Sequence, residues 1–320
     1  MILDIDQKAV LMPKVFSYKR LGDGERTKGK MVNNILDTAL IFEGGGMRAS
    51  YTSGILNNLL EEKLYFDYVA GISAGSSNAV NYLSRDINRA EKSFVDLVKD
   101  PKFGGWSTFF KGLGFFSAEY IYETIPQAGE LLPFDWEAFI KNPARLRIGA
   151  FHRDTGKMNY FTQNDICTMN DMMKIVRASS SLPFFMPPAE YRGEFYVDGG
   201  LAGGIPLDIA QKDGLKKFFV VLSREKGYSK IPFKHPKILN AYYRKYPAMV
   251  EAMVNRHKVY NRTLEELREL ESEGRAFLVY PDEMPVSSKE IDSDKLQESY
   301  NMGYEQGKRD FPRWRKFLEI

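Results

Sequence analysis

Residues 38–84 decide the fold, and they read TALIFEGGGMRASYTSGILNNLLEEKLYFDYVAGISAGSSNAVNYLS. The apolar run at 38–42 enters three consecutive glycines, and leucines then recur at helical spacing within residues 51–64. A second apolar run at 65–72 is followed by a sharp turn and a second helical segment at 74–84. This order of strand, glycine loop, helix, strand, turn and helix predicts the opening of a parallel α/β sheet.

The remainder of the chain continues this alternation of strands and helices. A helix is expected at 263–272, because Thr263 and Glu266 have the spacing of a capping box and leucines follow at helical intervals. Residues 1–36 are polar and irregular, so we expect them to be an N-terminal tail. No linker interrupts the pattern after them, so we expect one domain at 37–320. The further strands are expected at 146–152, 157–162, 217–222 and 276–280.

Composition favours a globular protein without a membrane-spanning helix. The 320 residues carry 45 basic and 42 acidic side chains, for a net charge of +3, and 43% are hydrophobic. A chain of this length buries about 75% of its unfolded surface. No apolar run reaches 18 residues, and residues 1–30 lack the pattern of a secretory signal, so a cytoplasmic protein is expected.

Cysteine content argues against a metal centre. Cys167 is the single cysteine, so the chain has no intrachain disulfide or cysteine-based metal site, and no local His/Cys cluster is present. We expect Cys167 to fill space in the core, and we expect neither a metal nor another cofactor.

The segment Gly71-Ile72-Ser73-Ala74-Gly75 is a G-x-S-x-G motif between a predicted strand and a predicted helix. A serine at such a turn projects its hydroxyl away from the backbone, and the flanking Gly71 and Gly75 avoid collisions with the crossing chain. The helix that starts at Ala74 directs its positive end toward a developing anion. Ser73 is therefore a candidate nucleophile.

The triplet Gly44, Gly45 and Gly46 follows the first predicted strand, and Arg48 lies two residues further on. Successive glycines allow backbone N–H groups to converge on one point, as an oxyanion hole requires, and Arg48 adds a positive charge. A flexible turn is the simpler alternative for such a triplet.

A nucleotide-binding loop is a second alternative for the same glycines. Gly44, Gly46 and Ala49 fit the G-x-G-x-x-A version of the dinucleotide fingerprint. That fingerprint needs an acidic residue at the end of the second strand, whereas Asp67 lies near the beginning of that strand. A P-loop does not fit either, because no Gly-Lys-Ser/Thr follows the glycines.

A third motif, Tyr196-Val197-Asp198-Gly199-Gly200, places Asp198 after a short apolar stretch and before two glycines. An Asp-Gly pair by itself usually forms a turn. Its position downstream of the serine motif makes Asp198 a candidate partner of Ser73.

Taken together, the motifs resemble those of the patatin-like phospholipases and lipid acyl hydrolases. In that family a glycine-rich oxyanion loop, a G-x-S-x-G elbow and a D-G-G/A aspartate occur in this order, as they do in this chain. The segment 178–188, with Pro183, Pro187 and Pro188, is similar to the A-S-x-x-x-P…P-P segment of the family. The family motifs fall within residues 37–225, and we expect residues 226–320 to be a C-terminal extension packed on the same core.

The resemblance implies a three-layer α/β/α serine hydrolase with a mainly parallel sheet and a catalytic dyad. Ser73 would be the nucleophile and Asp198 its base, without a histidine. A Ser-Asp-His triad is the alternative, and it would draw its histidine from His235 or His257, which follow the aspartate. The implied substrate is a lipid or phospholipid ester, and a catalytically idle lipid-binding protein is the alternative from another functional class.

Two further segments bear on substrate. Residues 106–122 are rich in aromatic side chains and fit an acyl pocket, a lid or ordinary core. Residues 224–262 hold ten Lys and Arg residues against two acidic residues, a local charge of +8 interleaved with tyrosines. This composition suits peripheral contact with an anionic membrane or a solvated face. We expect no nucleic-acid partner, because no recognition motif accompanies the charge.

Overall fold

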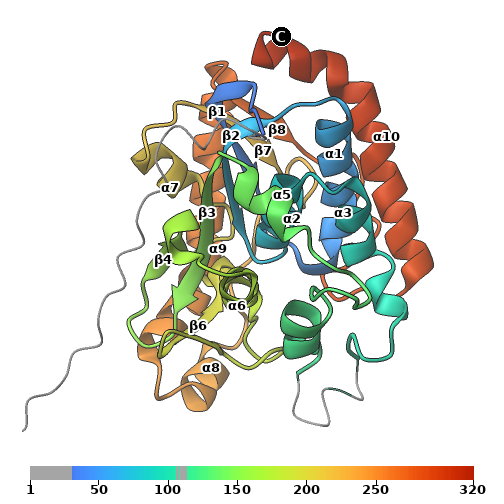
Figure 1. The fold of residues 1–320 in the computed structure, drawn as a ribbon. Coiled ribbons are helices and arrows are strands. Elements are labelled where there is room, and N and C mark those ends of the chain that lie inside the picture. The colour runs from blue at the N-terminus through green and yellow to red at the C-terminus, as the bar shows by residue number, and fades with distance from the viewer. Residues whose placement is uncertain (1–30, 106–107, 109–113) are drawn as a thin grey trace, which may run out of the picture. The chain divides into compact units, whose positions relative to one another are not determined.

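The central sheet of the computed structural model has eight strands (Figure 1). The structure describes residues 31–105, 108 and 114–320. The strands are β1 (Ile35–Phe42), β2 (Phe66–Ile72), β3 (Arg145–His152), β4 (Met158–Phe161), β5 (Ala189–Tyr191), β6 (Glu194–Asp198), β7 (Lys217–Val221) and β8 (Ala276–Val279). Their order in the sheet is β5-β6-β3-β2-β1-β7-β8, and β4 pairs with β3.

The sheet is mixed but mainly parallel. β3, β2, β1, β7 and β8 pair in parallel, whereas β6 and β4 run antiparallel to β3 and β5 runs antiparallel to β6. The expected mainly parallel sheet is therefore confirmed. The register of β3 with β6 sets Ala150 opposite Asp198, and β3 is the one strand between β6 and β2, so the aspartate lies across β3 from the end of β2 and the serine that follows it.

Helices cover both faces of the sheet, as the alternation of side chains along β1 requires. Leu40 and Phe42 belong to the core on one face, whereas Ala39 and Ile41 belong to the core on the other. The α-helices of the described residues are α1 (Ala49–Glu61), α2 (Ala74–Ser84), α3 (Ile87–Phe94), α5 (Trp136–Lys141), α6 (Met169–Ser180), α7 (Leu207–Lys212), α8 (Pro236–Tyr242), α9 (Pro247–Ser272) and α10 (Ser293–Leu318). The first core packs against α1, α2, α6 and α10, and the second packs against α7 and α9, which gives three layers.

The long helix α10 packs along α1, side by side with it in Figure 1. A Cβ on Gly54 would lie 2.4 Å from the carbonyl oxygen of Tyr300, so only glycine permits this approach. A buried hydrogen bond from the Tyr51 hydroxyl to the Gln306 side chain joins the same two helices. The last helix thus packs on the core formed by the first α/β unit.

Two expectations from the sequence were wrong. The helix expected at 263–272 begins at Pro247, and the Thr263 hydroxyl donates to the carbonyl of Val259 inside the helix rather than capping it. Cys167 is exposed, because it lies in the turn before α6, where its N–H donates to the carboxylate of Asp171. The expected tail at 1–36 lies outside the described residues except for residues 31–36, of which Ile35 begins β1.

None of the described helices is both long enough and apolar enough to cross a bilayer. Location in the cytoplasm stays a prediction.

Candidate active site

Ser73 lies at the sharp turn between β2 and α2, with φ of +57° and ψ of −132°. This conformation is rare for a residue with a side chain, and such backbone strain is typically worth about 1–3 kcal/mol. The flanking glycines make the turn sterically feasible. A Cβ on Gly71 would lie 2.2 Å from the carbonyl oxygen of Gly75, and one on Gly75 would lie 2.3 Å from the carbonyl oxygen of Phe42.

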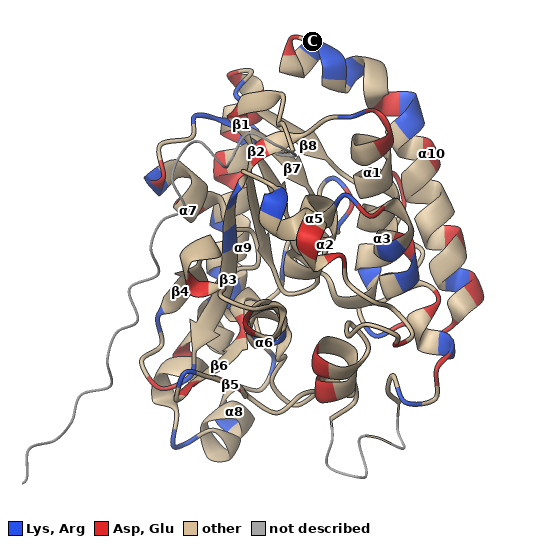
Figure 2. Cartoon of the chain, in the orientation of Figure 1, with Lys and Arg blue, Asp and Glu red and all other residues tan. Residues whose placement is uncertain are grey.

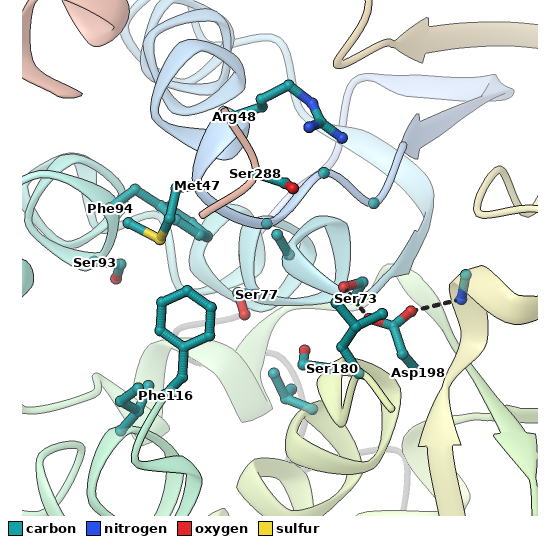
Figure 3. A pocket seen from close by; sticks show the side chains of 18 of the residues that line it. Met47, Arg48, Ser73, Ser77, Ser93, Phe94, Phe116, Ser180, Asp198 and Ser288 are labelled. Carbon is teal, nitrogen blue, oxygen red and sulfur yellow. Dashed lines mark hydrogen bonds between the residues drawn. The ribbon is translucent and has the colours of Figure 1, made fainter. Parts of the chain in front are cut away.

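The structure brings Ser73 and Asp198 together, although 125 residues separate them in the chain. The Ser73 hydroxyl donates to Oδ2 of Asp198 over 2.6 Å, and the two side chains face each other in Figure 3. The second carboxylate oxygen, Oδ1, accepts the Gly200 N–H at 2.6 Å. Each oxygen thus has a defined partner, which fixes the orientation of the carboxylate toward the serine.

Asp198 is 3% exposed, and burial raises the pKa of its carboxyl group above the ordinary value. The Ser73 hydroxyl, the Arg256 guanidinium and the Gly200 N–H oppose this shift because each stabilises the ionised form. A carboxylate with a raised pKa is a stronger base, so this environment suits proton abstraction.

Ser179, at the C-terminal end of α6, supports the serine turn. Its hydroxyl accepts the backbone N–H of Ser73 at 2.8 Å and donates to the carbonyl of Gly149 on β3 at 2.6 Å. The neighbouring Ser181 carbonyl accepts the backbone N–H of Asp198 at 2.9 Å. The C-terminal end of α6 therefore holds the backbone of both Ser73 and Asp198 by hydrogen bonds.

The glycine triplet follows β1 and packs against the serine turn. A Cβ on Gly44 would lie 2.9 Å from the carbonyl oxygen of Ile72, and the Gly44 N–H donates to the carbonyl of Gly204 at 3.0 Å. Within the described residues, neither the Gly45 nor the Gly46 N–H donates a hydrogen bond. These two donors are available to a bound group.

A loop that precedes α10 closes over the triplet. The carbonyl of Ser288 accepts the Met47 N–H at 3.2 Å, and a Cβ on Gly46 would lie 2.4 Å from that same carbonyl oxygen. Gly46 also has φ of +57°, which favours glycine. The C-terminal part of the chain thus contributes directly to the conformation of the glycine loop.

Arg48 belongs to the glycine loop and is 9% exposed. Its Nε atom has no hydrogen-bond partner within the described residues. Burial lowers the pKa of Arg48 to about 10, and the nearby Arg224 acts in the same direction, while Glu43 opposes it. At neutral pH the side chain remains a buried cation.

A cavity of about 340 Å³ opens onto Ser73 and Asp198. Much of its lining is apolar, and Figure 3 shows Met47, Phe94 and Phe116 on the far side of Ser73 from Asp198. Phe116 comes from the aromatic segment 106–122, of which residues 106–107 and 109–113 lie outside the described residues. Other apolar residues that line the cavity include Leu97, Phe103, Ile121, Ile125, Leu132, Met173, Val176, Leu182, Phe185 and Met186.

A family model for patatin-like phospholipases matches residues 40–211, which include the glycine triplet, the serine turn and Asp198. The chain belongs to the patatin-like phospholipase family. A second model, for a domain of unknown function (DUF6363), matches residues 246–319, which include α9 and α10 of this patatin-like protein.

Curated relatives resemble part of this patatin-like protein. It is 25% identical to YjjU of Escherichia coli over 57% of its own length and 51% of that relative. It is 28% identical to the probable lipid hydrolase 463L of invertebrate iridescent virus 6, over 56% of its own length and 64% of that relative. The chain therefore spans less than two thirds of the length of these two relatives.

A more distant relative and a solved structure also match. Human patatin-like phospholipase domain-containing protein 6 is 24% identical over 95% of this chain, which spans 22% of that protein. The crystal structure of VipD from Legionella pneumophila superposes with a TM-score of 0.48 and 11% identity, over 88% of this chain and 67% of VipD.

The three histidines of the patatin-like protein all lie within the described residues, and none lines the cavity. His152 pairs with the Glu194 carboxylate at 3.0 Å, His235 is exposed before α8, and Nδ1 of His257 contacts the carbonyl of Val254 on its own helix. No described group of three or more His, Cys, Asp and Glu residues has the arrangement of a metal site.

Sequence reasoning missed several residues around the site. Ser179 belongs to the 178–188 segment that the motif comparison had singled out, but nothing in the sequence indicated its hydrogen bond to Ser73. Arg256 and Tyr260 line the cavity from α9, and their spacing of four residues places them on one face of the helix. That spacing was the available signal, although it does not indicate which element the face contacts.

Proposed function

We propose that this protein is a serine hydrolase that cleaves carboxylic ester bonds of lipids through an acyl-enzyme on Ser73. The observation that carries the proposal is the 2.6 Å hydrogen bond from the Ser73 hydroxyl to the buried Asp198 carboxylate, at a strand-to-helix turn that opens into an apolar cavity. Membership of the patatin-like phospholipase family and similarity to a probable lipid hydrolase support a lipid ester as the substrate.

In the proposed mechanism, Oγ of Ser73 attacks the ester carbonyl carbon while its proton passes to Oδ2 of Asp198. The tetrahedral intermediate then expels the alcohol, which takes the proton from Asp198, and the acyl group remains on Ser73. A water molecule, deprotonated by Asp198, hydrolyses the acyl-enzyme and restores both side chains. The raised pKa of Asp198 supports its role as the base in both halves of the reaction.

We assign the oxyanion hole to the N–H groups of Gly45 and Gly46. Both donors are unused within the described residues, and the positive end of α2 begins at the neighbouring Ala74. Gly44 then acts by close packing, since its N–H is already bonded to Gly204. Arg48 adds a buried positive charge to the same loop. The acyl chain occupies the apolar part of the cavity.

We also propose that the protein contacts an anionic membrane through residues 231–245. Exposed apolar side chains gather there, with Ile231 71% and Tyr242 68% exposed. Exposed cations accompany them, and Figure 2 marks basic residues on and around α8. The ring of Phe184 lies 5.2 Å from that of Tyr242, and the next residue, Phe185, lines the cavity, so this surface adjoins the proposed acyl site.

Hydrolysis assays on purified variants test the proposal. With a neutral short-chain activated ester, Ser73→Ala and Asp198→Asn should each reduce kcat by about 10² or more, because removal of a positioned base costs about 10²–10⁴ in rate. The double variant should be no slower than Ser73→Ala, because the two groups act in one step. His152→Ala, His235→Ala and His257→Ala should retain most of the activity. A folded Ser73→Ala protein with the turnover of the parent would contradict the proposal.

A further inference from the structure

The cavity has a marked imbalance of charge. Six of its described lining residues are Lys or Arg, whereas Glu43 and Asp198 are the acidic ones among them. Two of the six cations differ from the others, since Arg89 donates to the carbonyls of Leu132 and Pro133 and Lys289 is exposed to solvent. The other four cations are Arg48, Arg224, Lys230 and Arg256.

Aromatic rings and backbone contacts position two of these cations. The Arg224 guanidinium lies 4.4 Å from the ring centre of Tyr228, and the Lys230 ammonium lies 3.9 Å from that of Tyr260. The backbone of Lys230 is fixed to α9, because its N–H donates to the Asn261 side chain and its carbonyl accepts from the same side chain. Ring faces hold the charges without neutralising them.

None of the four forms an ion pair with a described carboxylate. The Nε atoms of Arg48 and Arg256 are buried without a hydrogen-bond partner among the described residues, and the Arg48 side chain is nine-tenths buried. Glu43 and Asp198 are the nearby acids. One Glu43 oxygen accepts the Ser223 N–H, and the two Asp198 oxygens accept from Ser73 and Gly200. Buried, unpaired donors of this kind are costly unless an anion satisfies them.

We propose that Arg48, Arg224, Lys230 and Arg256 form a subsite for the dianionic phosphomonoester head group of an acyl lipid, such as a phosphatidate or lysophosphatidate. The proposal rests on the proposed function, because it places the ester bond at Ser73 and the phosphate among the cations of the same cavity. The subsite selects a phosphomonoester over zwitterionic and uncharged head groups.

Charge and geometry both favour this ligand. Guanidinium groups match phosphate oxygens through paired N–H donors. The two negative charges of a phosphomonoester offset more of the positive charge in the cavity than the single negative charge of a phosphodiester would. The quaternary ammonium group of a zwitterionic head group, by contrast, would add a positive charge beside four cations, which repel it. An uncharged head group would leave the four cations unsatisfied.

Titration of Lys230 supports the same ligand. Burial, followed by repulsion from Arg256, lowers the pKa of Lys230 to about 7; Arg48 and Arg224 act in the same direction, and Glu43 opposes them. The charge of Lys230 in turn acts to lower the pKa of Asp198. A bound dianion favours the ammonium form, so binding takes up a proton above pH 7 and weakens as the pH rises further.

The C-terminal part of the chain is essential to this subsite. Arg256 lies on α9 close to the Asp198 turn, since a Cβ on Gly200 would be 3.0 Å from its Nη2 atom. Tyr260 on the same helix holds Lys230, and the Ser288 loop shapes the glycine triplet. Residues 246–319 therefore supply one of the four cations, Arg256, and support Lys230 and the glycine loop, whereas the other cations come from earlier parts of the chain.

A binding measurement on the full chain tests the proposal without turnover. Ser73→Ala protein is titrated calorimetrically with oleoyl lysophosphatidate, oleoyl lysophosphatidylcholine and monooleoylglycerol below their critical micelle concentrations. Lysophosphatidate should bind at least about tenfold more tightly than either of the others, which is the effect of a charge-assisted hydrogen bond. Adding Arg224→Gln or Lys230→Met should reduce this preference to about threefold or less, whereas the exposed Lys226→Gln should preserve it.

Each outcome decides between explanations. Equal affinity for the three lipids, or a preference that survives both Arg224→Gln and Lys230→Met, would overturn the subsite. Inorganic phosphate that binds as tightly as lysophosphatidate would indicate a free phosphate as the occupant and would also overturn it. If the Ser73→Ala variant prefers lysophosphatidate but the parent protein hydrolyses no ester, the subsite is supported, and the proposed catalytic function is contradicted.

Discussion

Replacement of Ser179 by alanine should weaken both the fold and the reaction, because this hydroxyl holds the serine turn. Ser179 is fully buried, and removal of its hydroxyl leaves the Ser73 N–H without an acceptor. The Gly149 carbonyl also loses one donor. An unsatisfied buried donor costs about 1–3 kcal/mol, so the free energy of unfolding should fall by about 2 kcal/mol. The strained turn would also relax, and a displacement of Ser73 by about 1 Å costs about 10² in rate.

Ser181→Ala is the matched control for this variant. Ser181 is also fully buried at the end of α6, but its hydroxyl donates to the carbonyl of Arg177 within the helix, and only its backbone contacts Asp198. Urea unfolding and kcat for a neutral activated ester should both separate the two variants. If Ser179→Ala were as stable and as active as Ser181→Ala, the hydrogen bonds of Ser179 would contribute nothing to the site, and this reasoning would be refuted.

Three further predictions follow from the same contacts. Because burial raises the pKa of Asp198, kcat should be lost on acidification at a pH above about 4, where an ordinary carboxyl group takes up its proton. The ionised carboxylate is also the form that destabilises the fold, so Asp198→Asn should have a larger free energy of unfolding than the parent at neutral pH, and this difference should vanish in acid. Gly46→Val should reduce kcat by about 10²–10³, since a Cβ would lie 2.4 Å from the Ser288 carbonyl oxygen. An equal loss of substrate affinity and turnover, together with an altered circular dichroism spectrum, would indicate misfolding instead. Vesicles with anionic lipid should retain the protein at low salt and release it at high salt, and Lys234→Glu with Lys237→Glu should abolish retention; binding indifferent to salt and lipid charge would reject the membrane surface.

Much of the fold was accessible from the sequence because the decisive elements are local. The apolar run before the glycine triplet and the G-x-S-x-G turn predicted β1, β2 and α2, and α2 spans the predicted residues 74–84. The ends of these elements are visible in the sequence, because the turn between β2 and α2 needs Gly71 and Gly75, where a Cβ would collide with the backbone. The family and the fold are confirmed.

What the sequence concealed depends on contacts between distant segments. In α9 the capping-box spacing of Thr263 and Glu266 lies inside the helix, and packing of Met249 and Tyr260 against the rest of the chain extends the helix back to Pro247. The +8 segment 224–262 was interpreted as one surface. The structure divides it, because Arg224, Lys230 and Arg256 turn into the cavity whereas Lys234 and Lys237 are exposed. Only the tertiary fold separates these two groups.

Covalent labelling of Ser73 tests the central claim most directly. A fluorophosphonate reacts with an activated serine and needs no assumption about the natural lipid, and mass spectrometry identifies the modified residue. The Ser73–Asp198 geometry predicts one phosphonate on the peptide that contains Ser73, and about 10² slower labelling in Asp198→Asn. A folded protein whose Ser73 remains unlabelled, or is labelled equally fast without the Asp198 carboxylate, would contradict a serine nucleophile activated by this aspartate.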